Sequence, residues 1–137
     1  MKRLKIFFDG SSKGNPGPAG LGVIIFDERG RELRRIGRSL GVKTNNEAEY
    51  YALLKALEEA LKLGAKTVDL YSDSMLLVKQ LKGEYKVKAP RLKKLYQRAL
   101  NLSSRLDKIS IHYISRRLNR EADTLAKDAA KRVRALK

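Results

Sequence analysis

Cysteine is absent from the 137 residues of this chain. Without thiols, the chain can form neither disulfides nor thiolate metal sites, and the absence is compatible with a reducing compartment. Long apolar runs are missing as well. The apolar stretch within "MKRLKIFFDG" is too short for the core of a signal peptide, and no later run could span a bilayer. We therefore expect a soluble, cytoplasmic protein with no membrane partner.

Acidic residues are scarce relative to basic ones. The chain has 31 Lys and Arg against 15 Asp and Glu, which gives a formal net charge of +16. Such an excess favours a polyanionic partner, of which nucleic acid is the commonest. The alternative is a highly charged solvated surface, as in proteins from hot environments, although such surfaces balance their signs better. The length favours one core, so we expect a single domain spanning residues 1–137.

Hydrophobic periodicity predicts the element order β-β-β-α-β-α-α-β-α. Three strand candidates come first, and a turn at residues 28–30 joins the second to the third. Helical spacing follows over residues 45–64, where Asn45 or Asn46 can cap the helix and Gly64 can end it. The remaining expected elements are a strand ending at Asp73, helices over 75–83 and 90–106, a strand over 108–114 and a helix from Asn119.

The expected connections place two aspartates together. The first three strands can form an antiparallel meander, and each later strand follows a helix and can join in parallel by a right-handed crossover. If the fourth strand lies beside the first, Asp9 and Asp73 both lie at carboxyl ends of neighbouring parallel strands. The strand order reverses there, which is where open α/β sheets bind ligands.

Two further acids can reach the same place. Glu49 shares a helical stripe with Leu53 and Leu57, which should face the sheet, whereas Glu47 points elsewhere. Asp123 lies in the first turn of the last helix. Four close carboxylates stay ionised only if cations hold them, and oxygen ligands suit Mg²⁺ or Mn²⁺. Taken singly, each acid could instead be a turn former or complement a helix dipole.

Four segments carry a family resemblance. "DGSSKGNPGPAG", "TNNEAEYYAL", "YSDS" and "NREADTLA", in this order and spacing, resemble type 1 ribonuclease H from Lys5 to Ala130. The resemblance implies an α/β fold with a mixed five-stranded sheet, in the order 3-2-1-4-5, flanked by helices. It also implies a metal-dependent hydrolase, an endonuclease that cleaves the RNA strand of RNA–DNA hybrids. The expected products carry 5′-phosphate and 3′-hydroxyl ends.

The resemblance also implies roles for the acids. Asp9, Glu49, Asp73 and Asp123 match the catalytic, metal-binding positions, which leaves Glu47 outside the site. Asp9 and Asp123 would hold the ion that activates water. Asp9, Glu49 and Asp73 would hold the ion facing the leaving 3′ oxygen. The expected cofactor is a pair of Mg²⁺ ions, for which Mn²⁺ can substitute, and a pair about 4 Å apart suits phosphodiester hydrolysis.

The glycine-rich stretch after Asp9 is expected to admit the substrate. Small residues there let a duplex backbone approach, although a hairpin turn explains them equally. The predicted substrate-binding residues are Gly10, Ser11, Asn15, Thr44, Asn45, Asn46 and Arg117. Asn15 also suits a turn and residues 44–46 a helix cap, and both roles can hold together. Phosphate contacts carry no sequence information, so we expect cleavage that is largely sequence-independent by a monomer.

Other features depart from the family or leave choices open. The loop before the last helix reads "SRRLN" where many relatives have a histidine, and either Arg117 or Arg116 is a candidate replacement. The one histidine, His112, lies inside a predicted strand and is interpreted as structural. In "KGEYKVKAPRLKK", residues 86, 88, 91, 93 and 94 are candidate contacts, and a solvated helix face is the alternative for the last three.

Two rival functions are also compatible with the sequence. One is a non-catalytic module that binds hybrids or duplexes on the same fold, which the presence of all four acids disfavours. The other is a related exonuclease or strand transferase. Exonucleases with this sheet usually carry Asp-x-Glu on the first strand, whereas Asp9 is followed by Gly10 and Ser11.

Overall fold

A computed structural model describes residues 2–134. Its helices and strands follow the predicted order, with one additional 3₁₀ turn before the last helix. The elements are β1 (Arg3–Ser12), β2 (Gly17–Phe26), β3 (Glu32–Lys43), α1 (Asn45–Lys62), β4 (Thr67–Ser72), α2 (Met75–Leu81), α3 (Pro90–Ser103), β5 (Lys108–Tyr113), η1 (Arg116–Asn119) and α4 (Arg120–Arg134). None of the helices in this part of the chain is long and apolar enough to cross a membrane.

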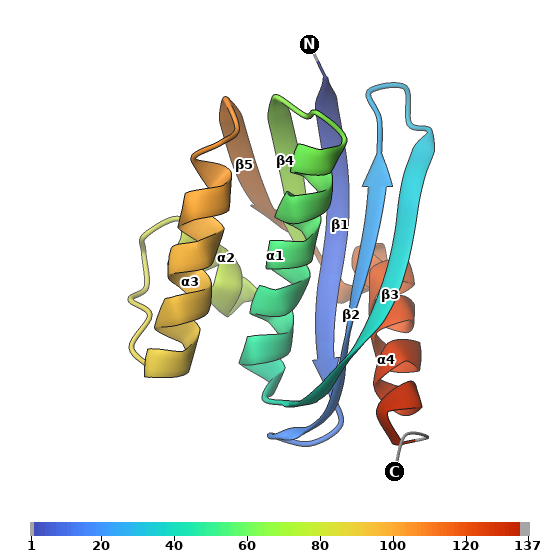
Figure 1. Cartoon of the computed structure of the whole chain (residues 1–137), viewed down its shortest axis with the longest axis vertical. Coiled ribbons are helices and arrows are strands. Elements are labelled where there is room, and N and C mark those ends of the chain that lie inside the picture. Colours follow the sequence, from blue (N-terminus) through green and yellow to red (C-terminus); the bar gives the residue numbers. More distant parts are fainter. Residues whose placement is uncertain (1, 135–137) are drawn as a thin grey trace.

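The strands form one mixed sheet in the order β3-β2-β1-β4-β5, which confirms the predicted order (Figure 1). β1 pairs antiparallel with β2 and parallel with β4, and β4 pairs parallel with β5. The parallel pairing of β1 with β4 ends at Phe7 opposite Tyr71. β1 itself continues to Ser12 against β2. Asp9 therefore lies just beyond the β1–β4 pairing and not at the end of its strand as predicted.

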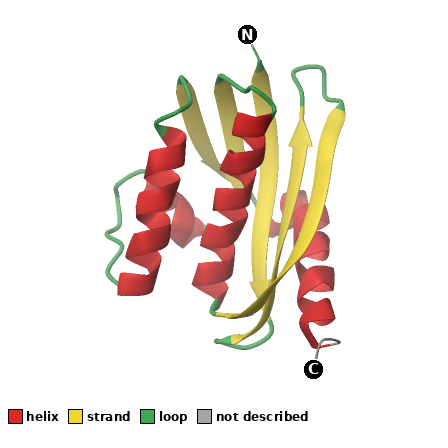
Figure 2. Ribbon diagram, viewed as in Figure 1, coloured by secondary structure: helices red, strands yellow, loops and turns green. Residues whose placement is uncertain are grey.

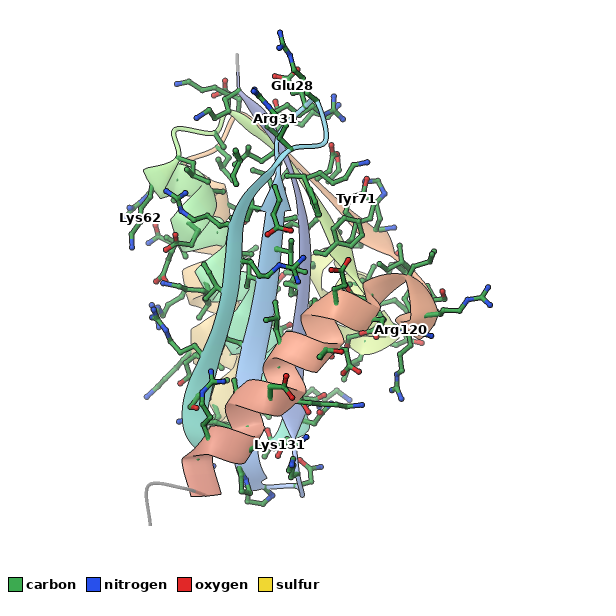
Figure 3. All side chains as sticks on the ribbon, turned by 90° about the vertical axis from the view of Figure 1, so that its right-hand side faces the viewer. Glu28, Arg31, Lys62, Tyr71, Arg120 and Lys131 are labelled. Carbon is green, nitrogen blue, oxygen red and sulfur yellow. The ribbon has the colours of Figure 1, made fainter. Side chains whose placement is uncertain are left out.

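Helices cover both faces of the sheet (Figure 2). α1 and α3 lie on one face, where Leu4, Ile6 and Phe8 of β1 are fully buried. α4 crosses the other face, with Arg120 and Lys131 directed outward (Figure 3). Glycines in β2 let α4 approach closely, because a Cβ at Gly22 would lie 2.1 Å from the carbonyl oxygen of Ala122. This close packing brings the start of α4 over the sheet near Asp9.

Four predicted helix boundaries were wrong, including that of α2, which ends at Leu81 and not at 83. Thr44 caps α1 in place of Asn45 or Asn46, since its hydroxyl accepts the Glu47 N–H while the Glu47 carboxylate accepts the Thr44 N–H. This reciprocal capping box satisfies two free donors of the helix end. α3 ends at Ser103, before the predicted 106. Asn119 ends the 3₁₀ turn η1, and α4 begins at Arg120.

Candidate active site

Three acids, from β1, from α1 and from the bend after β4, meet beyond the paired ends of β1 and β4. A carboxylate oxygen from each of Asp9, Glu49 and Asp73 lies within 4.8 Å of the other two. Asp9 and Glu49 are buried, with 4% and 6% of their surface exposed. The cavity that they line has a volume of about 270 Å³. We call it the acid cavity, and its lining residues are Asp9, Gly10, Ser11, Asn45, Glu49, Asp73, Ser74, Arg116, Asp123 and Lys127.

Asp123 lines the acid cavity from α4, next to the group of three. Its Oδ2 lies 3.1 Å from Nζ of Lys127, one helical turn further on. All four acids predicted from the sequence therefore face one cavity. Asp9, Glu49 and Asp73 form one group of carboxylates. Asp123 lies close to Asp9 and forms a side-chain hydrogen bond with it.

Close packing of α1 on β1 places Glu49. The Gly10 N–H donates to Oε1 of Glu49 at 2.7 Å. A Cβ at Gly10 would lie 2.2 Å from the backbone carbon of Ala48, so only glycine fits between the strand and the helix. One stretch of chain thus presents the Asp9 carboxylate and fixes the Glu49 carboxylate with the next amide.

Glu47 lies outside this group although it is also buried. Its Oε1 accepts the Thr44 N–H at 2.8 Å, which lowers the pKa of Glu47. Its charge is therefore used in capping α1. The two-residue spacing turns Glu49, and not Glu47, toward Asp9, as the helical stripe predicts.

The acid cavity disfavours several negative charges at once. Burial first, then the charge of Glu49 and a hydrogen bond with Asp123, raise the pKa of Asp9 far above its usual range. Burial also raises the pKa of Glu49, and the charges of Asp73 and Asp123 act in the same direction. A bound cation would reverse this preference. An all-oxygen donor set of carboxylates fits Mg²⁺ or Mn²⁺.

Two side-chain cations lie at the edge of this cavity. Nε of Arg116 is 4.0 Å from Oδ2 of Asp73, at the limit of an ion pair. Lys127 approaches Asp123 from the other side. Sequence reasoning missed Lys127, for which the four-residue spacing from Asp123 was the available signal. Of the two loop arginines, Arg116 lines the cavity and Arg117 does not.

Three of the predicted substrate-binding residues line the acid cavity, and Asn15, Thr44, Asn46 and Arg117 are not among its lining residues. Gly10, Ser11 and Asn45 line it. The Asn45 N–H donates to Oδ1 of Asn15 at 3.1 Å, which joins the glycine-rich turn to the start of α1. Thr44 caps α1, and Asn46 is exposed in its first turn.

A larger cavity of about 530 Å³ lies at the other end of the sheet. Of its three acids, Asp27 and Asp69 are paired with Arg31 and Arg3 at 2.7 and 2.9 Å, and Glu28 accepts the Arg3 N–H at 3.4 Å. Because the charges of Asp27 and Asp69 are already balanced, that cavity creates no comparable demand for a cation. His112 lies apart from the acid cavity and stacks on Tyr71, with ring centroids 4.9 Å apart.

Comparisons with known proteins point to one family. A family model described as reverse transcriptase-like matches residues 7–129. The bifunctional protein Rv2228c of Mycobacterium tuberculosis is 43% identical over 128 residues, covering 93% of this chain and 35% of that protein. Ribonuclease HI of Halobacterium salinarum is 40% identical, covering 93% of this chain and 64% of its own. The chain thus spans less than two thirds of these relatives.

Solved structures agree with this likeness over nearly the whole chain. The N-terminal RNase H domain of Rv2228c, solved as a fusion with maltose-binding protein, superposes with a TM-score of 0.95 at 39% identity and 98% coverage of both chains. LC11-RNase H1 in complex with an RNA/DNA hybrid has a TM-score of 0.89 at 38% identity, covering 98% of this chain and 99% of that one.

Proposed function

The chain belongs to the type 1 ribonuclease H family, and we propose that it is an endoribonuclease that cleaves the RNA strand of RNA–DNA hybrids. The observation that carries this proposal is the meeting of Asp9, Glu49 and Asp73, with Asp123 on the same cavity. The likeness to LC11-RNase H1, which was solved with a hybrid, supports the substrate. We also propose that residues 1–137 form one ribonuclease H domain, although residue 1 and residues 135–137 lie outside the described range. We propose that the protein is a cytoplasmic monomer.

The four acids are proposed to hold two divalent ions, with Mg²⁺ as the cofactor and Mn²⁺ as a substitute. Asp9 would serve both positions, together with Asp123 at one and with Glu49 and Asp73 at the other. When bound, such a pair supplies an activated water and stabilises the leaving 3′ oxygen, which gives 5′-phosphate and 3′-hydroxyl ends. The Gly10 N–H holds the Glu49 carboxylate in place, and Lys127 holds that of Asp123.

Substrate contacts are proposed around the same cavity. A protein that selects a hybrid must contact the ribose 2′-OH, and we propose that Glu49 and backbone groups near Gly10 and Ser11 make this contact. Asn15, Thr44, Asn45 and Asn46 would contact the nucleic-acid backbone. Phosphate contacts and a net charge of +16 make binding sensitive to salt and largely insensitive to sequence. Of the two arginines in the loop before α4, we propose Arg116 and not Arg117 as the substrate contact near Asp73, because Arg116 lines the cavity.

The test compares hybrid cleavage by the natural chain and by Asp73→Asn. An end-labelled RNA–DNA hybrid, an RNA duplex and a DNA duplex are incubated with Mg²⁺, with Mn²⁺, and with EDTA. We expect cleavage of the hybrid RNA strand only with metal, and its loss in Asp73→Asn with hybrid binding retained. Asp107→Asn, at an exposed position away from the cavity, is the control. Near-normal cleavage by Asp73→Asn, or cleavage that survives EDTA, would overturn the proposal.

A further inference from the structure

A basic loop joins α2 to α3. It comprises residues 82–89, and its lysines 82, 86 and 88 are exposed. Tyr85 is 48% exposed, and Nζ of Lys79 lies 4.9 Å from the centre of its ring. A basic segment with an exposed aromatic side chain suits the backbone of a nucleic acid. If this loop contacts a duplex, its position relative to the acid cavity determines where the duplex lies.

Few interactions hold this loop in place. At its start, the N–H groups of Glu84 and Tyr85 donate to the Lys79 carbonyl at 2.9 and 3.2 Å. Within the described part of the chain, residues 86–88 make no backbone–backbone hydrogen bond. Val87 is half-buried against the core. Beyond its start and the packing of Val87, the loop therefore depends on the contact that holds the backbone at Lys86.

That support comes from a buried glutamine. Gln80, on α2, is 5% exposed, and its Nε2 donates to the Lys86 carbonyl across a long 3.4 Å contact. Its Oε1 accepts a short hydrogen bond of 2.6 Å from the hydroxyl of Tyr50, which is also buried. A buried amide and a buried hydroxyl need such partners. The Tyr50 bond fixes which way the Gln80 amide faces and so directs Nε2 toward the loop.

Two supports of the loop, Tyr50 and the helix α2, begin beside the acid cavity. Tyr50 directly follows Glu49 on α1. Ser74, which caps α2, lines the cavity and directly follows Asp73. The seven residues of α2 span about 10 Å. The loop is thereby held at a set separation from the proposed metal ligands by one rigid helix and one buried polar contact.

We propose that Tyr50 and Gln80 are positioning residues that hold the basic loop in register with the acid cavity, so that the loop grips the phosphate backbone of the hybrid. This inference rests on the proposed function for the identity of the nucleic acid. Tyr50 and Gln80 do not line the cavity. The inference is that these two buried side chains nevertheless affect substrate binding. Their loss should weaken binding while the chemistry of the acids continues.

The test uses Tyr50→Phe, which removes the hydroxyl and keeps the ring. Tyr51→Phe is the matched control, because Tyr51 is the next residue on α1 and packs its ring near Nζ of Lys43 at 5.2 Å. Hybrid affinity is measured in an Asp73→Asn background, so that no cleavage occurs. We expect Tyr50→Phe to raise the Kd for the hybrid about three- to tenfold, as loss of one hydrogen bond allows, with Tyr51→Phe unchanged.

Two further measurements separate positioning from general loosening. Amide hydrogen exchange should accelerate at Glu84 and Tyr85 of Tyr50→Phe, whose N–H groups donate to the Lys79 carbonyl, and stay unchanged in β1 and β4. With Asp73 restored, KM should rise while kcat stays within about twofold, since the acids are untouched. The double variant Tyr50→Phe/Gln80→Leu leaves no buried polar atom of this pair unpartnered and should show the same loss of affinity with near-normal stability.

Unchanged exchange in the loop together with an unchanged Kd would overturn the inference, as would a fall in kcat at constant KM. Failure of the proposed function gives a different result. In that case the natural chain leaves the hybrid uncut with Mg²⁺, while loop exchange, which involves no nucleic acid, still reports whether Tyr50 and Gln80 hold the loop.

Discussion

Two buried glutamates on α1 have opposite electrostatic surroundings. Glu59, near the end of the helix, lies 3.1 Å from Nζ of Lys55 and 3.2 Å from Nζ of Lys62. Burial alone would raise the pKa of Glu59, but these two lysines lower it overall. Glu49, near the start of the helix, has Asp9 and Asp73 as neighbours, and burial raises its pKa. The two residues have similar exposed fractions, 6% for Glu49 and 8% for Glu59.

The difference shows how structural and functional charges can be distinguished. The charge of Glu59 is balanced by lysines of the same chain, so Glu59 needs no cation from outside the chain. Glu49 receives one backbone N–H and is otherwise surrounded by carboxylates, so its charge requires a cation from outside the chain. Burial of an acid alone therefore does not show whether the acid is structural or functional. The sign of the charges on the neighbouring side chains is what indicates a functional role.

The largest expected effect separates the two glutamates by activity. Glu49→Gln removes a proposed metal ligand, and because a bound ion contributes several kcal/mol to the transition state, hybrid cleavage should fall about 1,000-fold. Glu59→Gln, at the same burial on the same helix, should change cleavage by less than about twofold. Steady-state cleavage of a fluorescent hybrid in Mg²⁺ measures both. Similar losses in the two variants would show that the contrast in surroundings carries no functional meaning.

A second variant moves Glu49 without changing it. Gly10→Ala places a methyl group within 2.4 Å of three backbone atoms of α1. We expect the helix to shift, the Gly10–Glu49 bond to break and the free energy of unfolding to fall by about 3 kcal/mol. Urea denaturation measures this loss. Gly30→Ala, where nothing lies within 4 Å but φ is +79°, should cost only about 1 kcal/mol of strain. Equal losses would contradict the steric argument.

The raised pKa of Glu49 predicts a pH dependence of stability without metal. Its pKa in the folded protein is about 7, above the ordinary value of 4.5. The folded state therefore binds the proton more tightly, so this contribution is complete below about pH 4 and is lost as pH rises through 7. In EDTA, we expect the free energy of unfolding to fall by about 2 kcal/mol between pH 5 and pH 8 relative to Glu49→Gln.

Thermal unfolding in EDTA and in Mg²⁺ measures this loss and its reversal. At pH 8, Mg²⁺ should raise the Tm of the natural chain by about 5 °C and leave that of Glu49→Gln nearly unchanged. An equal response of both proteins to Mg²⁺ would place the ion elsewhere.

The smallest expected effect belongs to Glu59. Its pKa is lowered in the folded protein, so its contribution is present above its ordinary value of 4.5 and lost as pH falls through the folded pKa. Because Lys62 is largely exposed, solvent screens this network. Glu59→Gln should cost about 1 kcal/mol at pH 7, measured by urea denaturation, and almost nothing at pH 3. A loss that grows toward low pH would contradict this interpretation.

The succession of strands and helices along the chain and the choice of Glu49 over Glu47 could be predicted because each follows from a short-range period. Alternating residues identify strands, and Glu49 shares its helical stripe with Leu53. The capping residue of α1 is less predictable, because Thr44, Asn45 and Asn46 are all good caps and one residue of register decides between them.

Other features depend on contacts between distant residues. Nothing in the sequence links Tyr50 to Gln80, thirty positions away, or Gln80 to the backbone of Lys86. Arg116 and Arg117 are equivalent in the sequence, and the 3₁₀ turn of η1 decides which of them lines the acid cavity. Such side-chain pairings arise only when the elements are packed together.

The most direct test of the central claim is to locate Mn²⁺ by its anomalous scattering in crystals of the natural chain and, for comparison, of Asp73→Asn, both without nucleic acid. The predicted result is a peak within coordination distance of Asp9 and Glu49 in the natural chain that is weakened or lost in Asp73→Asn. An acid cavity without a peak at millimolar Mn²⁺, or peaks confined to other carboxylates such as Asp27 and Asp69, would contradict it.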